Sequence, residues 1–131
     1  MAKLTEEMKT LIAGMQVYVG TASADGKPSI GLKGSTKVLD DEHLAFYELA
    51  GGRTWQNLQK NPRVAIVVTN WAKMQGYRFE GKVVEIITSG PLYEEAKKLA
   101  EAMKIPVPPK AAIKVKIEEI YNLGKGGAKV S

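Results

Sequence analysis

Two groups of residues in this sequence carry side chains that could hold a phosphate. The first is Arg53 with Thr54, which follow two glycines at the predicted start of a short helix. An arginine offers two parallel donors to phosphate oxygens, and a threonine hydroxyl and the free amides of a helix start also donate. The second group lies on one predicted strand and comprises Lys33, Ser35, Thr36 and Lys37. Together the groups predict a site for a phosphorylated ligand, although each piece alone also fits surface cations and turn glycines.

Most other catalytic chemistry is excluded by residue type. The chain has one histidine and no cysteine, so it can form neither a Cys-His pair nor a helix with two histidine metal ligands. His43 follows three acidic residues at a predicted strand start, where a solvated turn histidine is expected. The glycine-lysine run over residues 124–129 is similar to a phosphate loop, but no helix follows it. We therefore predict no metal site and no catalytic acid or base.

Composition and charge limit the class of protein and of partner. A chain of 131 residues with 44% hydrophobic residues is expected to form one core and a single domain. The formal net charge of +5 favours anionic ligands, but acids are interspersed with the lysines, so nucleic acid is not expected as a partner. The sequence lacks both a run of roughly 18 apolar residues and a signal-peptide pattern. It predicts a cytoplasmic protein with no membrane partner.

Hydrophobic periodicity predicts a mainly β domain with small helices. A first helix begins after Thr5, as the N-cap, and ends near Ala13. Two more are expected over residues 53–60 and from Pro91 onwards. Apolar runs predict six strands, over residues 15–23, 29–37, 43–49, 64–68, 75–87 and 112–121. This succession predicts an antiparallel, barrel-like α+β domain over residues 1–123 and a flexible tail over 124–131.

An ordered set of short motifs resembles the pyridoxamine 5'-phosphate oxidase-like family of FMN-binding split barrels. The set is Lys37, Phe46-Tyr47, Gly51-Gly52-Arg53-Thr54, Asn57-Leu58 and Asn61-Pro62-Arg63-Val64. The resemblance extends over residues 8–123, with its core from 28 to 70. It implies a six-stranded antiparallel split β-barrel with small flanking helices, and a homodimer that holds each flavin between the two subunits.

The resemblance also implies which residues bind FMN. The phosphate would be held by Lys37 and Arg53 with the other residues of the second group, and the ring would lie over Tyr47 and Glu48. A family glutamine corresponds to Gln75, and Trp71 or Tyr77 would reach the partner's cofactor, although Trp71 equally fits an interface or core aromatic. The full set is Lys33, Gly34, Ser35, Thr36, Lys37, Tyr47, Glu48, Leu49, Ala50, Gly51, Arg53, Thr54, Asn57 and Gln75.

Two departures from the family pattern affect the expected activity. Thr54 stands where the vitamin B6 oxidase has a second basic residue, and the chain ends at Ser131 without that enzyme's C-terminal arginine and histidine segment. Oxidation of pyridoxamine phosphate is therefore not expected. We expect an FMN flavoprotein that passes hydride or electrons from a carrier such as NAD(P)H to a small acceptor. A non-enzymatic FMN electron carrier, an F420-dependent reductase and a structural barrel with an empty cleft remain as alternatives.

Overall fold

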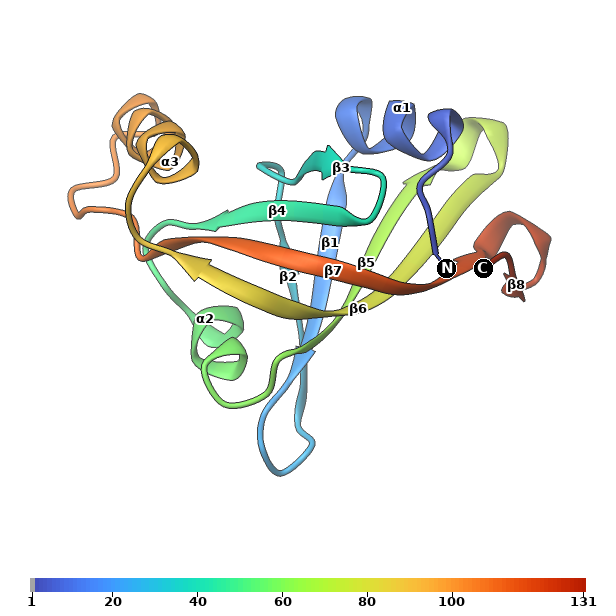
Figure 1. Ribbon diagram of the computed structural model, residues 1–131, viewed down its shortest axis with the longest axis horizontal. Coiled ribbons are helices and arrows are strands. Elements are labelled where there is room, and N and C mark those ends of the chain that lie inside the picture. Colours follow the sequence, from blue (N-terminus) through green and yellow to red (C-terminus); the bar gives the residue numbers. More distant parts are fainter. Residues whose placement is uncertain (1) are drawn as a thin grey trace.

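Eight antiparallel strands form one continuous sheet in the computed structural model, which describes residues 2–131 (Figure 1). The order of neighbouring strands is β2-β1-β5-β6-β7-β4-β3, and β8 pairs with the end of β7. The antiparallel, mainly β class is confirmed, but the described residues form eight strands where six were predicted. The strands are β1 Val17–Ala22, β2 Pro28–Leu32, β3 Lys37–Asp40, β4 His43–Glu48, β5 Arg63–Asn70, β6 Gln75–Ile87, β7 Ala111–Asn122 and β8 Ala128–Lys129.

A turn at Lys33–Thr36 divides the predicted strand 29–37 into β2 and β3. The backbone N–H and the Oγ1 hydroxyl of Thr36 both donate to the carbonyl of Lys33, at 3.1 and 2.7 Å. Side-chain hydrogen bonds of this kind compete with pairing in a sheet. Because β2 and β3 stand at opposite ends of the strand order, the turn carries the chain from one edge of the sheet to the other. The prediction of a single strand was wrong here.

The other additional strand comes from the residues that were expected to form a flexible tail. After the 3-10 turn η2 (Leu123–Lys125), the chain reverses direction and β8 pairs with β7, with Lys129 opposite Tyr121. The N–H of Ile120 also donates to the carbonyl of Ser131 at 2.8 Å. These backbone bonds hold residues 128–131 against the sheet.

The main hydrophobic core lies inside the curved sheet and beneath helix α1 (Glu6–Gly14). Thr5 accepts a hydrogen bond from the backbone of Met8 at 3.3 Å, so the predicted N-cap is confirmed. The apolar stripe of α1 packs on the inward side chains of the strands. The buried core includes Met8, Leu11, Ile12, Val17, Val19, Leu44, Phe46, Ile66, Val68, Phe79, Ile113, Val115 and Ile120.

Strand β6 depends on one glycine where it crosses β7. The pairing register shifts between Glu80 and Gly81, and again between Val83 and Glu85. A Cβ atom at Gly81 would lie 2.0 Å from the carbonyl oxygen of Lys116, so the two backbones approach more closely than any other residue permits. This close approach lets a 13-residue strand bend around the core.

Two helices flank the end of β4 (Figure 1). Helix α2 (Arg53–Leu58) packs on β1, where the Asn57 amide donates to Thr21 Oγ1 at 3.0 Å. Helix α3 (Pro91–Ala102) covers a second, smaller apolar cluster that includes Tyr47, Ala96 and Ala112. The remaining 3-10 turn, η1 (Trp71–Lys73), joins β5 to β6. Within residues 2–131, none of the helices is long and apolar enough to cross a membrane.

Candidate functional site

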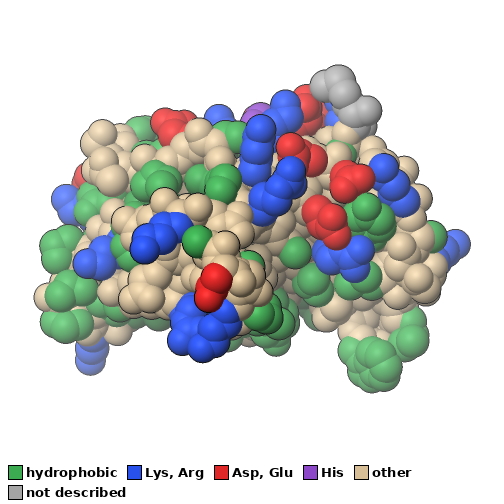
Figure 2. All heavy atoms as spheres, turned by 90° about the horizontal axis from the view of Figure 1, so that it is seen from below, with side chains coloured by type: hydrophobic (Ala, Val, Ile, Leu, Met, Phe, Trp, Pro, Cys, Tyr) green, Lys and Arg blue, Asp and Glu red, His purple; other side chains and the backbone are tan. Residues whose placement is uncertain are grey.

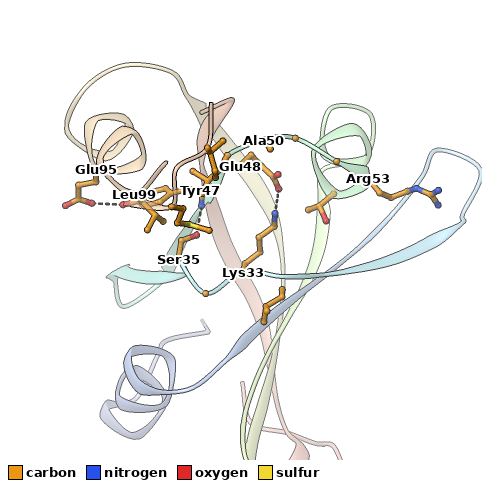
Figure 3. A pocket seen from close by; sticks show the side chains of 16 residues that line it. Lys33, Ser35, Tyr47, Glu48, Ala50, Arg53, Glu95 and Leu99 are labelled. Atoms are coloured by element: carbon orange, nitrogen blue, oxygen red, sulfur yellow. Dashed lines mark hydrogen bonds and ion pairs between the residues drawn. The ribbon is translucent and has the colours of Figure 1, made fainter. Parts of the chain in front are cut away.

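A cavity of about 670 Å³ opens where β4 ends, between α2 and α3 (Figure 3). This volume lies within the range of small-molecule sites, roughly 300–1,000 Å³. The turn after β2 forms one wall, the loop from β4 to α2 forms a second, and α3 with the residues after it forms a third. The lining residues are Leu32, Lys33, Gly34, Ser35, Tyr47, Glu48, Leu49, Ala50, Gly51, Gly52, Arg53, Thr54, Glu95, Leu99, Met103 and Ile105.

Most of the residues predicted to bind the cofactor line this cavity. They come from two separate segments of the sequence, the turn after β2 and the end of β4 with the loop that follows. A hydrogen bond from the Tyr47 N–H to Ser35 Oγ, at 3.0 Å, holds the two segments together. The structure brings together Lys33, Gly34, Ser35, Tyr47, Glu48, Leu49, Ala50, Gly51, Arg53 and Thr54.

Four predicted residues do not line the cavity. Thr36 and Asn57 are buried and bond to the Lys33 carbonyl and to Thr21 Oγ1, so each holds the scaffold. Gln75 begins β6 and donates to Glu7 of α1 at 3.2 Å. The Lys37 ammonium lies 3.0 Å from Glu95, on the α3 side.

The structure separates the two cations that were expected to share one phosphate. Glu95, which holds Lys37, lies on one side of the cavity, and Arg53 lies on the other (Figure 3). Lys37 is thereby paired with a carboxylate, whereas Arg53 has no ion pair among the described residues. Arg53 extends from the start of α2 toward the β1–β2 hairpin. The prediction that Lys37 and Arg53 together bind a single phosphate is therefore not supported.

Gly51 shapes the loop that carries Arg53. Its φ of +81° lies in the left-handed region that favours glycine. A Cβ atom here would also lie 3.1 Å from the Cε atom of Lys110, whose backbone N–H donates to the carbonyl of Glu48 at 2.8 Å. Lys110 is thus a second cation beside this loop, and its distance along the sequence explains why motif spacing did not reveal it.

Helix α3 supplies a wall of the site that sequence reasoning missed. Its apolar face was predicted, but nothing in that pattern identifies β4 as the surface it covers. The Tyr47 hydroxyl donates to Glu95 Oε2 at 2.6 Å, and Lys37 lies 3.0 Å from the same oxygen. Burial, followed by the bond to Glu95, raises the pKa of Tyr47 above its usual range. The residues missed are Leu32, Gly52, Glu95, Leu99, Met103 and Ile105.

The contact between Tyr47 and Glu95 predicts an acid-sensitive attachment of α3. The Tyr47 hydrogen bond, and then Lys37, hold the pKa of Glu95 below its usual value of 4.5. A lowered folded-state pKa adds stability above the unfolded-state value, and this stability is lost as the pH falls through the folded value. Wild type should therefore have a higher melting temperature than Glu95→Gln at pH 7. The difference should shrink as the pH falls below 4.5 and be lost once the pH has passed the lower folded-state pKa.

Calorimetry across pH 3–7 tests this expectation, with Glu94→Gln as the matched control. Glu94 lies on the same helix and pairs with Lys97, at 3.6 Å. A melting difference that is independent of pH would contradict the expectation for Glu95.

The inner part of the cavity contains an ion pair. The Lys33 ammonium lies 3.1 Å from Glu48 Oε2, and the two side chains point toward one another (Figure 3). Glu48 is 2% exposed, so burial raises its pKa, while Lys33 opposes that rise without cancelling it. Arg53 stands at the mouth of the cavity, and its side chain extends away from this pair toward the β1–β2 hairpin (Figure 3). The cavity thus combines apolar walls, a charge-balanced inner end and a cationic mouth.

Basic residues elsewhere do not form a single stripe on the face shown in Figure 2. Lysines and arginines on that face are interspersed with acidic and apolar side chains. His43 lies outside the cavity, at the start of β4, with Nδ1 2.8 Å from Asp40 Oδ1.

Sequence comparison identifies related proteins. A profile described as pyridoxamine 5'-phosphate oxidase matches residues 4–124. The uncharacterised protein MJ0282 of Methanocaldococcus jannaschii is 35% identical over 126 residues, which cover 95% of this chain and 83% of that protein. HupZ of Group A Streptococcus, a solved structure, is 37% identical with a TM-score of 0.83, over 98% of this chain and 99% of that chain.

More distant solved structures share the fold alone. An FMN-binding protein from Syntrophomonas wolfei is 18% identical with a TM-score of 0.74, over 88% of this chain and 82% of that one. An F420 reductase has 21% identity and a TM-score of 0.68, and HutZ, the heme storage protein of Vibrio cholerae, has 13% and 0.67. The profile match and the two closer relatives extend over nearly the whole chain. The chain therefore belongs to the pyridoxamine 5'-phosphate oxidase family.

Proposed function

We propose that this protein binds FMN in the cavity at the end of β4 and acts as an oxidoreductase. The observation that carries the proposal is the cavity itself. Its volume of about 670 Å³ suits a cofactor-sized ligand, and its walls combine leucines with exposed backbone and one free arginine. Family membership and the likeness to an FMN-binding protein of the same fold support the choice of FMN.

Charge suggests how the ligand would lie. Arg53, the unpaired cation at the mouth, suits a phosphate dianion. At the inner end Lys33 is balanced by Glu48, and Leu32, Leu49 and Leu99 add apolar surface, which suits a flat ring without net charge. The backbone of residues 49–51 lies beside this surface and could bond the polar edge of the ring.

The residues of the cavity would bind and orient the cofactor. FMN, when bound, supplies hydride and electron transfer itself, so few acid–base side chains are required. Leu99 and Met103 of the α3 wall would exclude water from the ring, while Arg53 and Ser35 would contact its polar substituents. The electron donor is proposed to be a reduced nicotinamide or a similar carrier.

A binding titration followed by a donor assay tests the proposal. The purified protein is titrated with FMN and with riboflavin, and flavin fluorescence and the visible spectrum are recorded. We expect saturable FMN binding, tighter than that of riboflavin, and oxidation of NADH or NADPH by the loaded protein. FMN binding without turnover would favour the electron-carrier alternative, and failure to bind FMN would overturn the proposal.

F420 and haem are the competing ligands, because two solved structures of the same fold are an F420 reductase and a heme storage protein. F420 would place its acidic tail at the mouth, where Lys110 lies beside Gly51 of the loop that carries Arg53. Haem held by an axial histidine is disfavoured, since His43 is the single histidine of the sequence and lies outside the cavity. Titration with each ligand separates the cases, because bound haem gives a Soret band and F420 its own fluorescence.

We further propose that two copies of the chain associate through the exposed face of β1 and β2. Tyr18 pairs with Leu32 and Gly20 with Ile30, which places three large apolar side chains on one face. Ile30 is 76% exposed and Leu32 is 59% exposed, and Leu32 also lines the cavity. An apolar surface of this kind that adjoins a ligand site is typical of an interface.

The expected oligomer is a homodimer that Ile30→Glu converts to a monomer. A buried glutamate in each copy would lose its hydration without gaining a partner. Size-exclusion chromatography with light scattering measures the mass, and Val107→Glu is the matched control because Val107 is 44% exposed in the loop after α3. A monomeric wild type, or a dimer unaffected by Ile30→Glu, would contradict this interface.

A further inference from the structure

The Lys33–Glu48 pair lies at the end of the hydrophobic interior, where a carboxylate is costly to bury. Along β4, Glu48 follows Leu44 and Phe46 on the inward face, and all three are buried. The Lys33 side chain is 17% exposed, and its Nζ lies 6.0 Å from the centre of the Phe46 ring. A leucine at position 48 would continue the apolar row without the cost of desolvating a charge.

The local fold does not use the full bonding capacity of Glu48. Lys33 Nζ lies 3.1 Å from Oε2 and forms an ion pair with it. Oε2 is fully buried, and apart from Lys33 no donor approaches it within residues 2–131. The Glu48 backbone carbonyl, not its side chain, accepts the bond from Lys110. What the carboxylate contributes is therefore a negative charge beside Lys33, on the wall of the cavity.

We propose that Glu48 acts through Lys33 to balance the charge at the inner end of the cavity and so sets the relative affinity for oxidised and reduced FMN. This inference rests on the proposed function. Reduction of the flavin ring takes up two electrons from the donor and one proton from solvent, which leaves the ring with one negative charge. An unbalanced cation nearby would favour the reduced ring by direct Coulomb attraction. With Glu48 in place, that attraction is largely cancelled.

Glu48→Gln is expected to raise the midpoint potential of bound FMN. The variant keeps the shape of the side chain and leaves the positive charge of Lys33 uncompensated. Reduced FMN should then bind about tenfold more tightly relative to oxidised FMN, which for a two-electron couple is a rise of about 30 mV. The double variant Lys33→Met/Glu48→Gln removes both charges and should return the potential close to that of wild type.

Reductive titration at pH 7 with a reference dye measures these potentials. Glu94→Gln is the matched control, since it removes the same charge from the exposed face of α3 and should leave the potential unchanged. Glu48→Leu makes the same charge change and serves as the second variant if the glutamine protein is unstable. A general loss of packing would not produce a rise in the single variant that disappears in the double variant.

The outcomes separate this inference from the function on which it rests. A rise in Glu48→Gln that disappears in the double variant supports it. Wild type that binds FMN with a potential unaffected by either variant overturns the inference alone. Wild type that binds no FMN overturns the proposed function, and this inference with it.

Discussion

Replacing Arg53 by methionine is expected to weaken FMN binding roughly ten- to a hundredfold while leaving riboflavin binding unchanged. A hydrogen bond to a charged group contributes about 1.5–3 kcal/mol, and 1.4 kcal/mol corresponds to a tenfold change in affinity. Arg53 is the free cation of the cavity mouth, so a phosphate would lose its principal charged partner. Riboflavin lacks the phosphate and should be insensitive to the change.

Fluorescence titration of both flavins with both proteins measures this effect. Lys82→Met is the matched control, because Lys82 is an exposed cation of β6 that lines neither cavity to which Arg53 contributes. Equal losses of FMN and riboflavin affinity in Arg53→Met would show that the arginine supports the ring or the fold. An unchanged FMN affinity would show that Arg53 does not bind the phosphate.

Gly81→Ala is expected to cause the largest loss of stability among the glycine-to-alanine variants of this chain. The new Cβ would lie 2.0 Å from the Lys116 carbonyl oxygen and 3.0 Å from its carbon, both backbone atoms of the central strand β7. Overpacking usually costs about 1–3 kcal/mol, and here neither atom belongs to a side chain that could turn away. We expect a loss of about 3 kcal/mol or more, a large part of the roughly 5–15 kcal/mol of a typical domain.

Urea unfolding followed by circular dichroism provides the test, and Gly14→Ala provides the control. Gly14 ends α1, and a Cβ there would meet nothing within 4 Å, so alanine should leave the midpoint nearly unchanged. If the two variants unfold at the same urea concentration as wild type, β6 and β7 are not in the close contact that bends the barrel.

The sequence by itself determined the elements whose signals are local. Thr5 begins α1 because a side-chain cap acts within one turn. Alternation of apolar residues specified β7 to within a residue or so, since a period of two is a property of the strand itself. The motif from Tyr47 to Thr54 also placed most of one cavity wall correctly, because consecutive residues at a strand end necessarily stay together.

Only the tertiary structure decided which of these segments meet. The segment Lys33–Thr36 was expected to continue a strand, although Gly34 and Ser35 are residue types common in turns. It forms a turn because its flanking strands pair at opposite edges of the sheet. The α3 wall depends on packing between residues about fifty positions apart, as in Tyr47 and Glu95. Such contacts leave no periodic signal along the chain.

The tertiary structure also determined which of the cations are paired with carboxylates. In the sequence Lys33, Lys37 and Arg53 are three equivalent cations, and each could hold a phosphate. The fold pairs Lys33 with the buried Glu48 and Lys37 with Glu95, and leaves Arg53 without an ion pair in the described chain. The availability of a cation depends on which carboxylate folding brings within about 4 Å and on how far water is excluded from the pair. Residue type and spacing specify neither quantity.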